Sequence, residues 1–307
     1  MKYEFNERRY DFTTIHPLPT GRRKTRRVMV GGISVGGDEP IRVQSMTTTL
    51  TTDVEATASQ AVRMVQAGCE IVRVTTPNLD DVQAIPAIRK RMKDQGCEAP
   101  LVADVHFNPG VAYEASKVAD KVRINPGNFA DGKRFLSREY SDEEYTACMK
   151  KVDEKLAPLV DLLKNQGRSL RLGVNHGSLS DRVMNRYGDN PEGMVQCCLE
   201  YLDLCEKRDF GDIIISLKAS NPKVMIQAYR LLARRLEETG RDYPFHLGVT
   251  EAGGGIEGRL KSAVGIATLL DEGLGDTIRV SLTEDPAAEI PVAFSLLGLF
   301  KNVSSLP

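Results

Sequence analysis

Several features that would assign a chain of 307 residues to a special class are missing from this sequence. No apolar run approaches the ~18 residues that a membrane-spanning helix needs. Residues 1–12 also lack the apolar core of a secretory signal. The 41 basic and 42 acidic side chains nearly cancel, which argues against a general nucleic-acid-binding protein. These absences predict a cytoplasmic protein with no membrane or nucleic-acid partner.

Cysteine is present, but not in a metal-binding arrangement. No Cys-x-x-Cys pair occurs among the six cysteines, which are Cys69, Cys97, Cys148, Cys197, Cys198 and Cys205. A chain of this size needs no disulfides to hold its core. The sequence therefore predicts buried thiols that act as small hydrophobic side chains, and no metal site within the chain.

Short β-branched runs alternate with longer helical patterns along most of the sequence. Eight runs have the character of strands, at 41–46, 71–75, 101–105, 121–125, 169–175, 212–218, 245–250 and 277–283. Strands that alternate with helices pair in parallel through right-handed crossovers. Eight such units predict a (β/α)8 TIM barrel. An open doubly wound sheet is disfavoured, because residues 44–50 contain no Gly-x-Gly-x-x-Gly turn.

The chain divides into three parts around this barrel. Residues 1–37 form an N-terminal extension whose last part, 28–37, is expected to be a β-hairpin that covers the bottom of the barrel. The basic run at 22–27 within it is interpreted as a solvated face. Residues 38–301 form the barrel, with an insertion at 128–168 between the fourth and fifth strands, in which Ser141 and Glu144 have the spacing of a helix cap. Residues 302–307 are expected to be a truncated linker.

Polar and charged side chains gather where the predicted strands end. In a TIM barrel the active site lies at the C-terminal ends of the strands, and side chains two apart on a strand point the same way. The candidates are Arg73, Asp104, His106, Arg123, Asn125, Arg171, Asn175, Lys218, Glu251, Arg279 and Ser281. His106 is open between a catalytic role and a simple hydrogen bond to Asp104.

Four arginines and one lysine aimed at one opening would be costly if buried without partners. Asp104 and Glu251 neutralise only part of this charge. Guanidinium groups suit phosphate oxygens, so the sequence predicts a site for a multiply anionic ligand. The glycine-rich loop at 253–258 could add backbone N–H groups at the start of a helix.

Seven motifs in register resemble one enzyme family. They are IVRV (71–74), VADVHF (102–107), VRINPGN (122–128), LGVNHGSL (172–179), SLKAS (216–220), HLGVTEAG (246–253) and TIRVSLT (277–283). Together they resemble the barrel portion of 4-hydroxy-3-methylbut-2-enyl diphosphate synthase, an oxidoreductase of non-mevalonate isoprenoid biosynthesis. The segments at 128–168 and 175–182 resemble the longer, three-domain members.

The resemblance implies reductive ring opening of 2-C-methyl-D-erythritol 2,4-cyclodiphosphate in a bacterial cytoplasm, with ferredoxin or flavodoxin as electron donor. It implies that Arg73, Arg123, Arg171, Lys218, Arg279 and Ser281 hold the diphosphate, and that Asp104, Asn175 and Glu251 hold the carbon skeleton. Asn125 would add a neutral hydrogen bond. Glu251 would handle the proton, with His106 as the weaker candidate.

The family's [4Fe-4S] cluster is held by three cysteines and a glutamate, which the resemblance places outside this chain. The chain is therefore expected to bind substrate but to be inactive alone, and a homodimer is compatible with the full-length form. Two alternatives stay open. Lys218 could form a Schiff base as in aldolases, or the chain could be a non-catalytic diphosphate-binding module.

Overall fold

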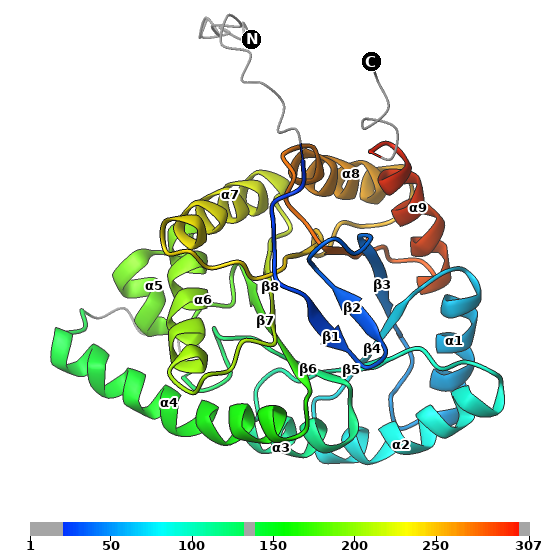
Figure 1. Cartoon of the computed structure of the whole chain (residues 1–307), viewed down its shortest axis with the longest axis horizontal. Helices are drawn as coiled ribbons and strands as arrows, with labels where there is room; N and C mark the ends of the chain where they lie inside the picture. Colours follow the sequence, from blue (N-terminus) through cyan, green and yellow to red (C-terminus); the bar gives the residue numbers. More distant parts are fainter. Residues whose placement is uncertain (1–20, 132–138, 301–307) are drawn as a thin grey trace, which may run out of the picture.

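The computed structural model describes residues 21–131 and 139–300, which form a ring of helices around a central barrel of strands (Figure 1). The barrel strands are β3 (Arg42–Met46), β4 (Ile71–Thr75), β5 (Leu101–Asp104), β6 (Lys121–Ile124), β7 (Ser169–Asn175), β8 (Ile213–Lys218), β9 (His246–Leu247) and β10 (Thr277–Ile278). Residues 302–307, the expected linker, lie outside the described residues.

Neighbouring barrel strands all run parallel, in the order β8-β7-β6-β5-β4-β3-β10-β9. One parallel bridge between Ile215 and Phe245 joins the two ends of this order, where the Ile215 N–H donates to the Pro244 carbonyl over 2.9 Å. The order of the strands in the chain is thus their order around the ring. This arrangement confirms the predicted (β/α)8 barrel.

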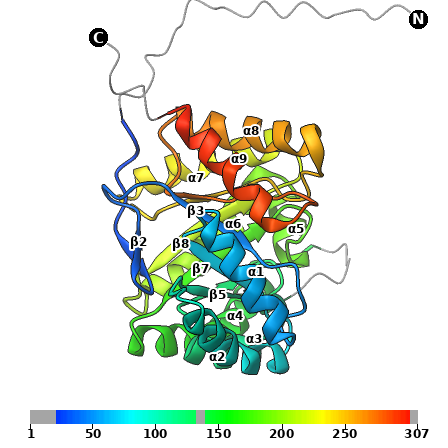
Figure 2. The same ribbon diagram turned by 90° about the vertical axis from the view of Figure 1, so that its right-hand side faces the viewer.

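The helices surround the barrel on the outside (Figures 1 and 2). They are α1 (Val54–Gln66), α2 (Leu79–Asp94), α3 (Pro109–Val118), α4 (Asp142–Asn165), α5 (Asp181–Tyr187), α6 (Pro191–Glu206), α7 (Pro222–Glu238), α8 (Gly255–Asp271) and α9 (Pro286–Gly298). Within the described ranges, no helix combines the length and apolar character needed to cross a bilayer. The sequence did not predict α5, which is too short to show a helical period.

Alternation along each strand separates the core from the site. On β4, Val72 and Val74 belong to the large apolar cluster between strands and helices, whereas Arg73 lines the pocket on the barrel axis. Because successive side chains of a strand point to opposite faces, every second residue of each strand faces the axis.

The predicted hairpin is present and consists of β1 (Val28–Val30) and β2 (Ile33–Val35), paired antiparallel. It crosses the middle of the ring in Figure 1. Val28, Val30 and Val35 pack in one apolar cluster, and its barrel members are Ile71, Val102 and Ile214. The hairpin therefore closes the end of the barrel opposite the site.

The basic run at 22–27 is only partly the solvated face that its composition suggested, since Lys24 and Arg27 are exposed but Arg23 and Arg26 are not. Arg23 donates to the carbonyls of Tyr243 and Arg241, at 2.9 and 3.1 Å, and its guanidinium lies 4.6 Å from the centre of the Phe245 ring. Arg26 pairs with Asp242. Buried carbonyls need donors, and Arg23 supplies them here, whereas Arg26 neutralises a carboxylate.

The long segment at 128–168 contains α4, the helix that connects β6 to β7. Ser141 caps this helix, and Glu144 reaches back to the Ser141 backbone, so the predicted capping box is present. Residues 132–138 of the segment lie outside the described part. The helix is 24 residues long, which accounts for much of the unusual length of this connection.

The last two strands are shorter than the predicted 245–250 and 277–283. The reason is that the amides beyond Arg279 bond elsewhere: Leu282 N–H donates to the Glu289 carboxylate at 3.0 Å, and Thr283 N–H donates to the Gly253 carbonyl at 3.2 Å. A parallel ladder cannot continue without these donors. Residues near Glu251 and Ser281 therefore lie on loops and not at strand ends.

Candidate functional site

A pocket of about 520 Å³ opens at the C-terminal ends of the barrel strands. Ten of the eleven residues predicted from the sequence line it: Arg73, Asp104, His106, Arg123, Arg171, Asn175, Lys218, Glu251, Arg279 and Ser281. They come from seven of the eight strands or from the loops that follow them. Topology alone thus brings residues from 73 to 281 to one opening.

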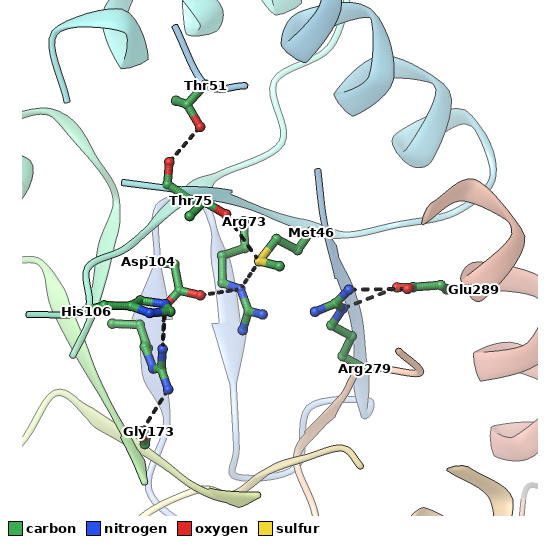
Figure 3. Close-up of polar contacts among 10 residues, drawn as sticks. Met46, Thr51, Arg73, Thr75, Asp104, His106, Gly173, Arg279 and Glu289 are labelled. Atoms are coloured by element: carbon green, nitrogen blue, oxygen red, sulfur yellow. Dashed lines mark hydrogen bonds and ion pairs between the residues drawn. The ribbon is translucent and has the colours of Figure 1, made fainter. Parts of the chain in front are cut away.

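Asp104 is the ionic centre of the pocket (Figure 3). Its Oδ1 accepts from Arg123 Nη1 at 2.8 Å, its Oδ2 lies 3.2 Å from Arg73 Nε, and His106 Nε2 lies 3.6 Å from Oδ1. Burial opposes ionisation of this carboxyl, but Arg123 and Arg73 outweigh it and hold the pKa of Asp104 well below its usual range. Asp104 is therefore a carboxylate that positions two arginines.

Arg73 has a second neighbour that the sequence analysis did not identify. Its Nε lies 3.0 Å from the thioether sulfur of Met46, which the Thr75 hydroxyl approaches at 3.8 Å (Figure 3). Burial lowers the pKa of Arg73 to about 10, which leaves it cationic at neutral pH. A weak sulfur acceptor orients the guanidinium without neutralising it.

Arg279 is held by a buried carboxylate that sequence reasoning also missed. Glu289 of α9 accepts from Arg279 Nε and Nη2, both at 3.2 Å (Figure 3). It also accepts from Ser45 Oγ at 2.5 Å and from Leu282 N–H at 3.0 Å. Glu289 is 1% exposed, so it acts from behind the pocket wall and fixes Arg279 in position.

Replacing this carboxylate gives a first prediction. Glu289→Gln should lower the free energy of unfolding by about 1–3 kcal/mol, because a charged acceptor of four hydrogen bonds becomes a neutral one that also carries donors. Urea unfolding of this variant beside the surface variant Glu237→Gln measures the difference. Equal stability of the two variants would contradict the positioning role of Glu289.

Positive charge exceeds negative charge in the pocket. Arg73, Arg123, Arg171 and Arg279 are at most 7% exposed, whereas the buried carboxylates beside them are Asp104 and Glu289. Nε and Nη1 of Arg171 have no hydrogen-bond partner in the described structure. Burial is the larger cause, and the positive charge of Arg73 the next, of a pKa of Lys218 that lies well below its ordinary value. A bound anion would relieve this repulsion.

Glu251 lies at the rim, on the loop after β9. Its side chain is exposed, and its φ of 52° is in the left-handed region, which non-glycine residues seldom adopt without a reason. Its carboxylate forms no ion pair with another described residue. It is thus an acidic group that borders the pocket and is not neutralised by the arginines.

Asn125 is the predicted site residue that does not line the pocket. Its Nδ2 donates to Ser178 Oγ at 3.0 Å and its Oδ1 accepts from Gly127 N–H at 3.0 Å. Ser178 itself does line the pocket. Asn125 therefore supports the pocket wall from behind, and Ser178, to which it donates, is the side chain that lines the pocket.

The glycine-rich loop at 253–258 is also not part of the pocket lining. The N–H of Gly255, at the start of α8, donates to Glu284 at 2.9 Å, and Arg259 pairs with the same carboxylate. The loop was expected to offer its N–H groups to a phosphate. A protein carboxylate already occupies this helix N-terminus.

The cysteines do not assemble into a metal site. Among the described residues, no three histidine, cysteine or acidic side chains are grouped so that they could hold a metal ion. Burial raises the pKa of the Cys69 and Cys198 thiols to about 12, and a metal ligand must be a thiolate. The residues present therefore do not fit an iron–sulfur cluster.

Comparison with known proteins connects this geometry to a family. The model of the GcpE TIM-barrel domain matches residues 25–294. The flavodoxin-type 4-hydroxy-3-methylbut-2-en-1-yl diphosphate synthase of Leptospira interrogans is 54% identical over 291 residues, which are 94% of this chain and 44% of the relative. That of Akkermansia muciniphila is 51% identical over 287 residues, 93% of this chain and 49% of the relative.

Solved structures share the fold at low sequence identity. A sialic acid synthetase from Leptospira borgpetersenii superposes with a TM-score of 0.55 at 10% identity, over 93% of each chain. The dihydropteroate synthase of Xanthomonas albilineans gives 0.54 at 16% identity, over 92% of this chain and all of that one. The chain spans about half the length of the curated relatives, and it belongs to the GcpE TIM-barrel domain family.

Proposed function

We propose that this chain is the substrate-binding barrel of a 4-hydroxy-3-methylbut-2-en-1-yl diphosphate synthase and binds 2-C-methyl-D-erythritol 2,4-cyclodiphosphate. The observation that carries the proposal is the excess of buried positive charge in the pocket over Asp104 and Glu289. The relatives that match over most of this chain carry the synthase name. A cyclic diphosphate has two negative charges held close together, which suits converging guanidinium groups.

Each side chain of the pocket then has a role that follows from its position. Arg171 and Lys218, which form no ion pair with a carboxylate of the described residues, take the diphosphate most directly, with Arg73, Arg123, Arg279 and Ser281 around them. Asn175 lies at the end of β7, opposite Lys218 in the backbone ladder between β7 and β8. Its side-chain amide is offered to the ligand hydroxyls. Asp104 keeps its arginines in position, and Glu251 is the proton-handling group, with His106 as the weaker candidate.

The reductive half of the reaction lies beyond the described residues. The full-length enzyme would use a [4Fe-4S] cluster and an electron donor such as flavodoxin, the partner named in the relatives, or ferredoxin. Since the described residues do not fit a cluster, the isolated chain should bind the cyclodiphosphate without converting it. A homodimer of the full-length form belongs to the same proposal, as does a location in the bacterial cytoplasm.

Arg171 provides the sharpest mutational test of the binding role. Arg171→Met should weaken cyclodiphosphate binding by about 1.5–3 kcal/mol, the value of a charge-assisted hydrogen bond. It should also raise the free energy of unfolding by about 1 kcal/mol or more, because a buried, repelled cation is replaced by an apolar side chain. Calorimetry and urea unfolding measure the two quantities. The exposed Arg234→Met is the matched control, and loss of stability together with unchanged affinity would contradict the role.

One observation favours a second candidate function. The lowered pKa of Lys218 would make its amine a nucleophile, as Schiff-base aldolases require. Borohydride treatment in the presence of phosphorylated keto sugars tests this candidate. We expect no adduct on Lys218, since the arginines around it are arranged for a diphosphate; a trapped adduct would favour the aldolase.

The binding proposal itself is tested by comparing two ligands. The cyclodiphosphate should bind the 307-residue chain about 10-fold or more tightly than 2-C-methyl-D-erythritol 4-phosphate, because two linked phosphates can engage guanidinium groups from several strands at once, whereas a single phosphate reaches fewer of them. Phosphorus NMR of the mixture should show the cyclodiphosphate bound but chemically unchanged. Equal affinity for both ligands would contradict a diphosphate site.

A non-catalytic binding module would show the same two affinities as the barrel of a synthase. The two are distinguished by turnover: joining the barrel to the cluster-bearing part of a synthase should give turnover, and no turnover would favour the non-catalytic module.

A further inference from the structure

Much of the barrel interior directly below the pocket is polar, although Ile71 of β4 and Val102 of β5 are apolar at the same level. Gln44, Lys121, Ser169, Ser216, His246 and Thr277 are each at most 2% exposed. TIM-barrel interiors are usually filled by branched apolar residues. We call these six residues the buried polar layer.

Strand alternation shows that this layer faces the axis. Lys121 precedes Arg123 by two residues on β6, and Ser216 precedes Lys218 by two on β8; Arg123 and Lys218 line the pocket. Residues two apart on a strand share a face and lie about 6.6 Å apart. The buried polar layer is therefore one step deeper than the pocket, above the apolar hairpin.

Lys121 and His246 are the titratable members of the layer, and both lack hydrogen-bond partners for their side-chain nitrogens in the described structure. Lys121 lies opposite Ser169 in the β6–β7 ladder. The bridge between Ile215 and Phe245 places His246 beside Ser216, one residue further on. A buried amine or imidazole with no carboxylate partner is more stable without its proton.

The surrounding charges act in the same direction. Charged or titratable groups that face the layer or the pocket above it are Arg73 from β4, Asp104 from β5, Lys121 and Arg123 from β6, Arg171 from β7, Lys218 from β8, Arg279 with Glu289 of α9, and His106, His176 and Glu251 at the rim. From α7, Tyr229 contributes a neutral hydroxyl that donates to the His246 carbonyl. Guanidinium groups keep their protons in proteins, so within the buried layer only Lys121 and His246 can relieve the repulsion.

The direction of titration agrees with this geometry. The pKa of Lys121 is lowered well below its ordinary value, mainly by burial and to a lesser extent by the positive charges of Arg171 and Arg73. The pKa of His246 is lowered mainly by burial, and to a lesser extent by Lys218 and Arg171. The pKa of Lys218, which lines the pocket above, is lowered in the same way.

We propose that Lys218, Lys121 and His246 form a buried proton store that is uncharged in the ligand-free barrel and takes up protons when a dianionic cyclic diphosphate binds in the pocket. Two negative charges placed above the store replace repulsion with attraction, which favours the protonated forms. Binding and proton uptake are then linked: ligand binding raises the affinity of the store for protons, and protonation of the store raises the affinity for the ligand. The inference rests on the proposed function, since it needs a dianion in this pocket.

Isothermal titration calorimetry of the 307-residue chain with the cyclodiphosphate tests the proposal. Titrations at pH 8 in buffers of different ionisation enthalpy and constant ionic strength give the number of protons taken up, as the slope of binding enthalpy against buffer enthalpy. The ligand's phosphodiester groups do not titrate in this range, so any uptake belongs to the protein. We expect at least about half a proton per ligand, and an affinity that falls as the pH rises.

Variants assign the uptake to the store. Lys121→Met and His246→Gln should each reduce the slope, while Lys150→Met, a change on the exposed face of α4, should leave it unchanged. If the buried variants do not fold, His106→Gln and His176→Gln decide, since both imidazoles line the pocket: uptake that persists in both variants belongs to the store, and uptake that is lost in either overturns it. Binding with a slope of zero overturns the proton store but not the proposed function, whereas absence of binding contradicts the proposed function itself.

Discussion

Asp104→Asn should lower the free energy of unfolding by about 3–5 kcal/mol, the largest effect on stability that we expect from one substitution in this barrel. The carboxylate lies 2.8 Å from Arg123 Nη1 and 3.2 Å from Arg73 Nε. Both guanidinium groups are buried. An amide of the same shape would leave two buried cations without a counter-charge, next to the guanidinium groups of Arg171 and Arg279.

Urea unfolding at pH 7 measures this loss, and a second substitution separates charge from packing. Adding Arg123→Met to Asp104→Asn should restore part of the stability, because one uncompensated cation is removed with the anion. If Asp104→Asn costs less than about 1 kcal/mol, or if the double variant is less stable than either single variant, the carboxylate is not the ionic centre described here.

The Asp104 carboxylate also determines how the free energy of unfolding changes in acid. Because the pKa of Asp104 in the folded chain lies well below its ordinary value of 3.8, its contribution is fully present above that value. The contribution is lost as pH falls below 3.8 toward the folded-state pKa. Asp104→Asn should therefore reduce the acid dependence of the unfolding free energy.

Glu251→Gln should lower turnover about 10²- to 10⁴-fold, the range of a lost general acid, while changing the affinity for the cyclodiphosphate less than about 3-fold. Glu251 borders the pocket at the rim, outside the group of buried arginines. Glutamine keeps its size but cannot supply a proton to a leaving hydroxyl. The unusual φ of 52° indicates that the fold holds this residue in place.

Turnover is measured in a chimera in which this barrel replaces the corresponding part of the Leptospira interrogans synthase, a relative 54% identical over the shared region. The unsubstituted chimera provides the reference rate, and His106→Gln tests the weaker proton-handling candidate. Turnover of the Glu251→Gln chimera at the reference rate would remove Glu251 from the proton-handling role.

Much of the site could be predicted because barrel topology converts sequence position into spatial position. The strands carry alternating patterns, so Arg73, Arg123 and Arg171 could be assigned to one opening without knowing any distance. The charge argument then needed only the number of cations and carboxylates at that opening. Ten of the eleven predicted residues line the pocket for this reason.

What could not be predicted depends on contacts between distant segments. Glu289 lies ten residues beyond Arg279 on a different element, and nothing in its local sequence indicates that it turns inward. Asn125 satisfies the same strand-end rule as its neighbours, but its amide is used by Ser178 and Gly127. His246 begins β9, and nothing in its local sequence indicates that its imidazole is fully buried with neither ring nitrogen hydrogen-bonded to a described residue.

The central claim is that converging buried cations make this barrel a diphosphate-binding site. Calorimetric titration of the 307-residue chain with 2-C-methyl-D-erythritol 2,4-cyclodiphosphate at two salt concentrations tests it most directly. We predict saturable binding of one ligand per chain, weaker at the higher salt concentration because ions screen charge–charge attraction. Absence of binding, or binding that is independent of salt and unaffected by Arg171→Met, would contradict the account.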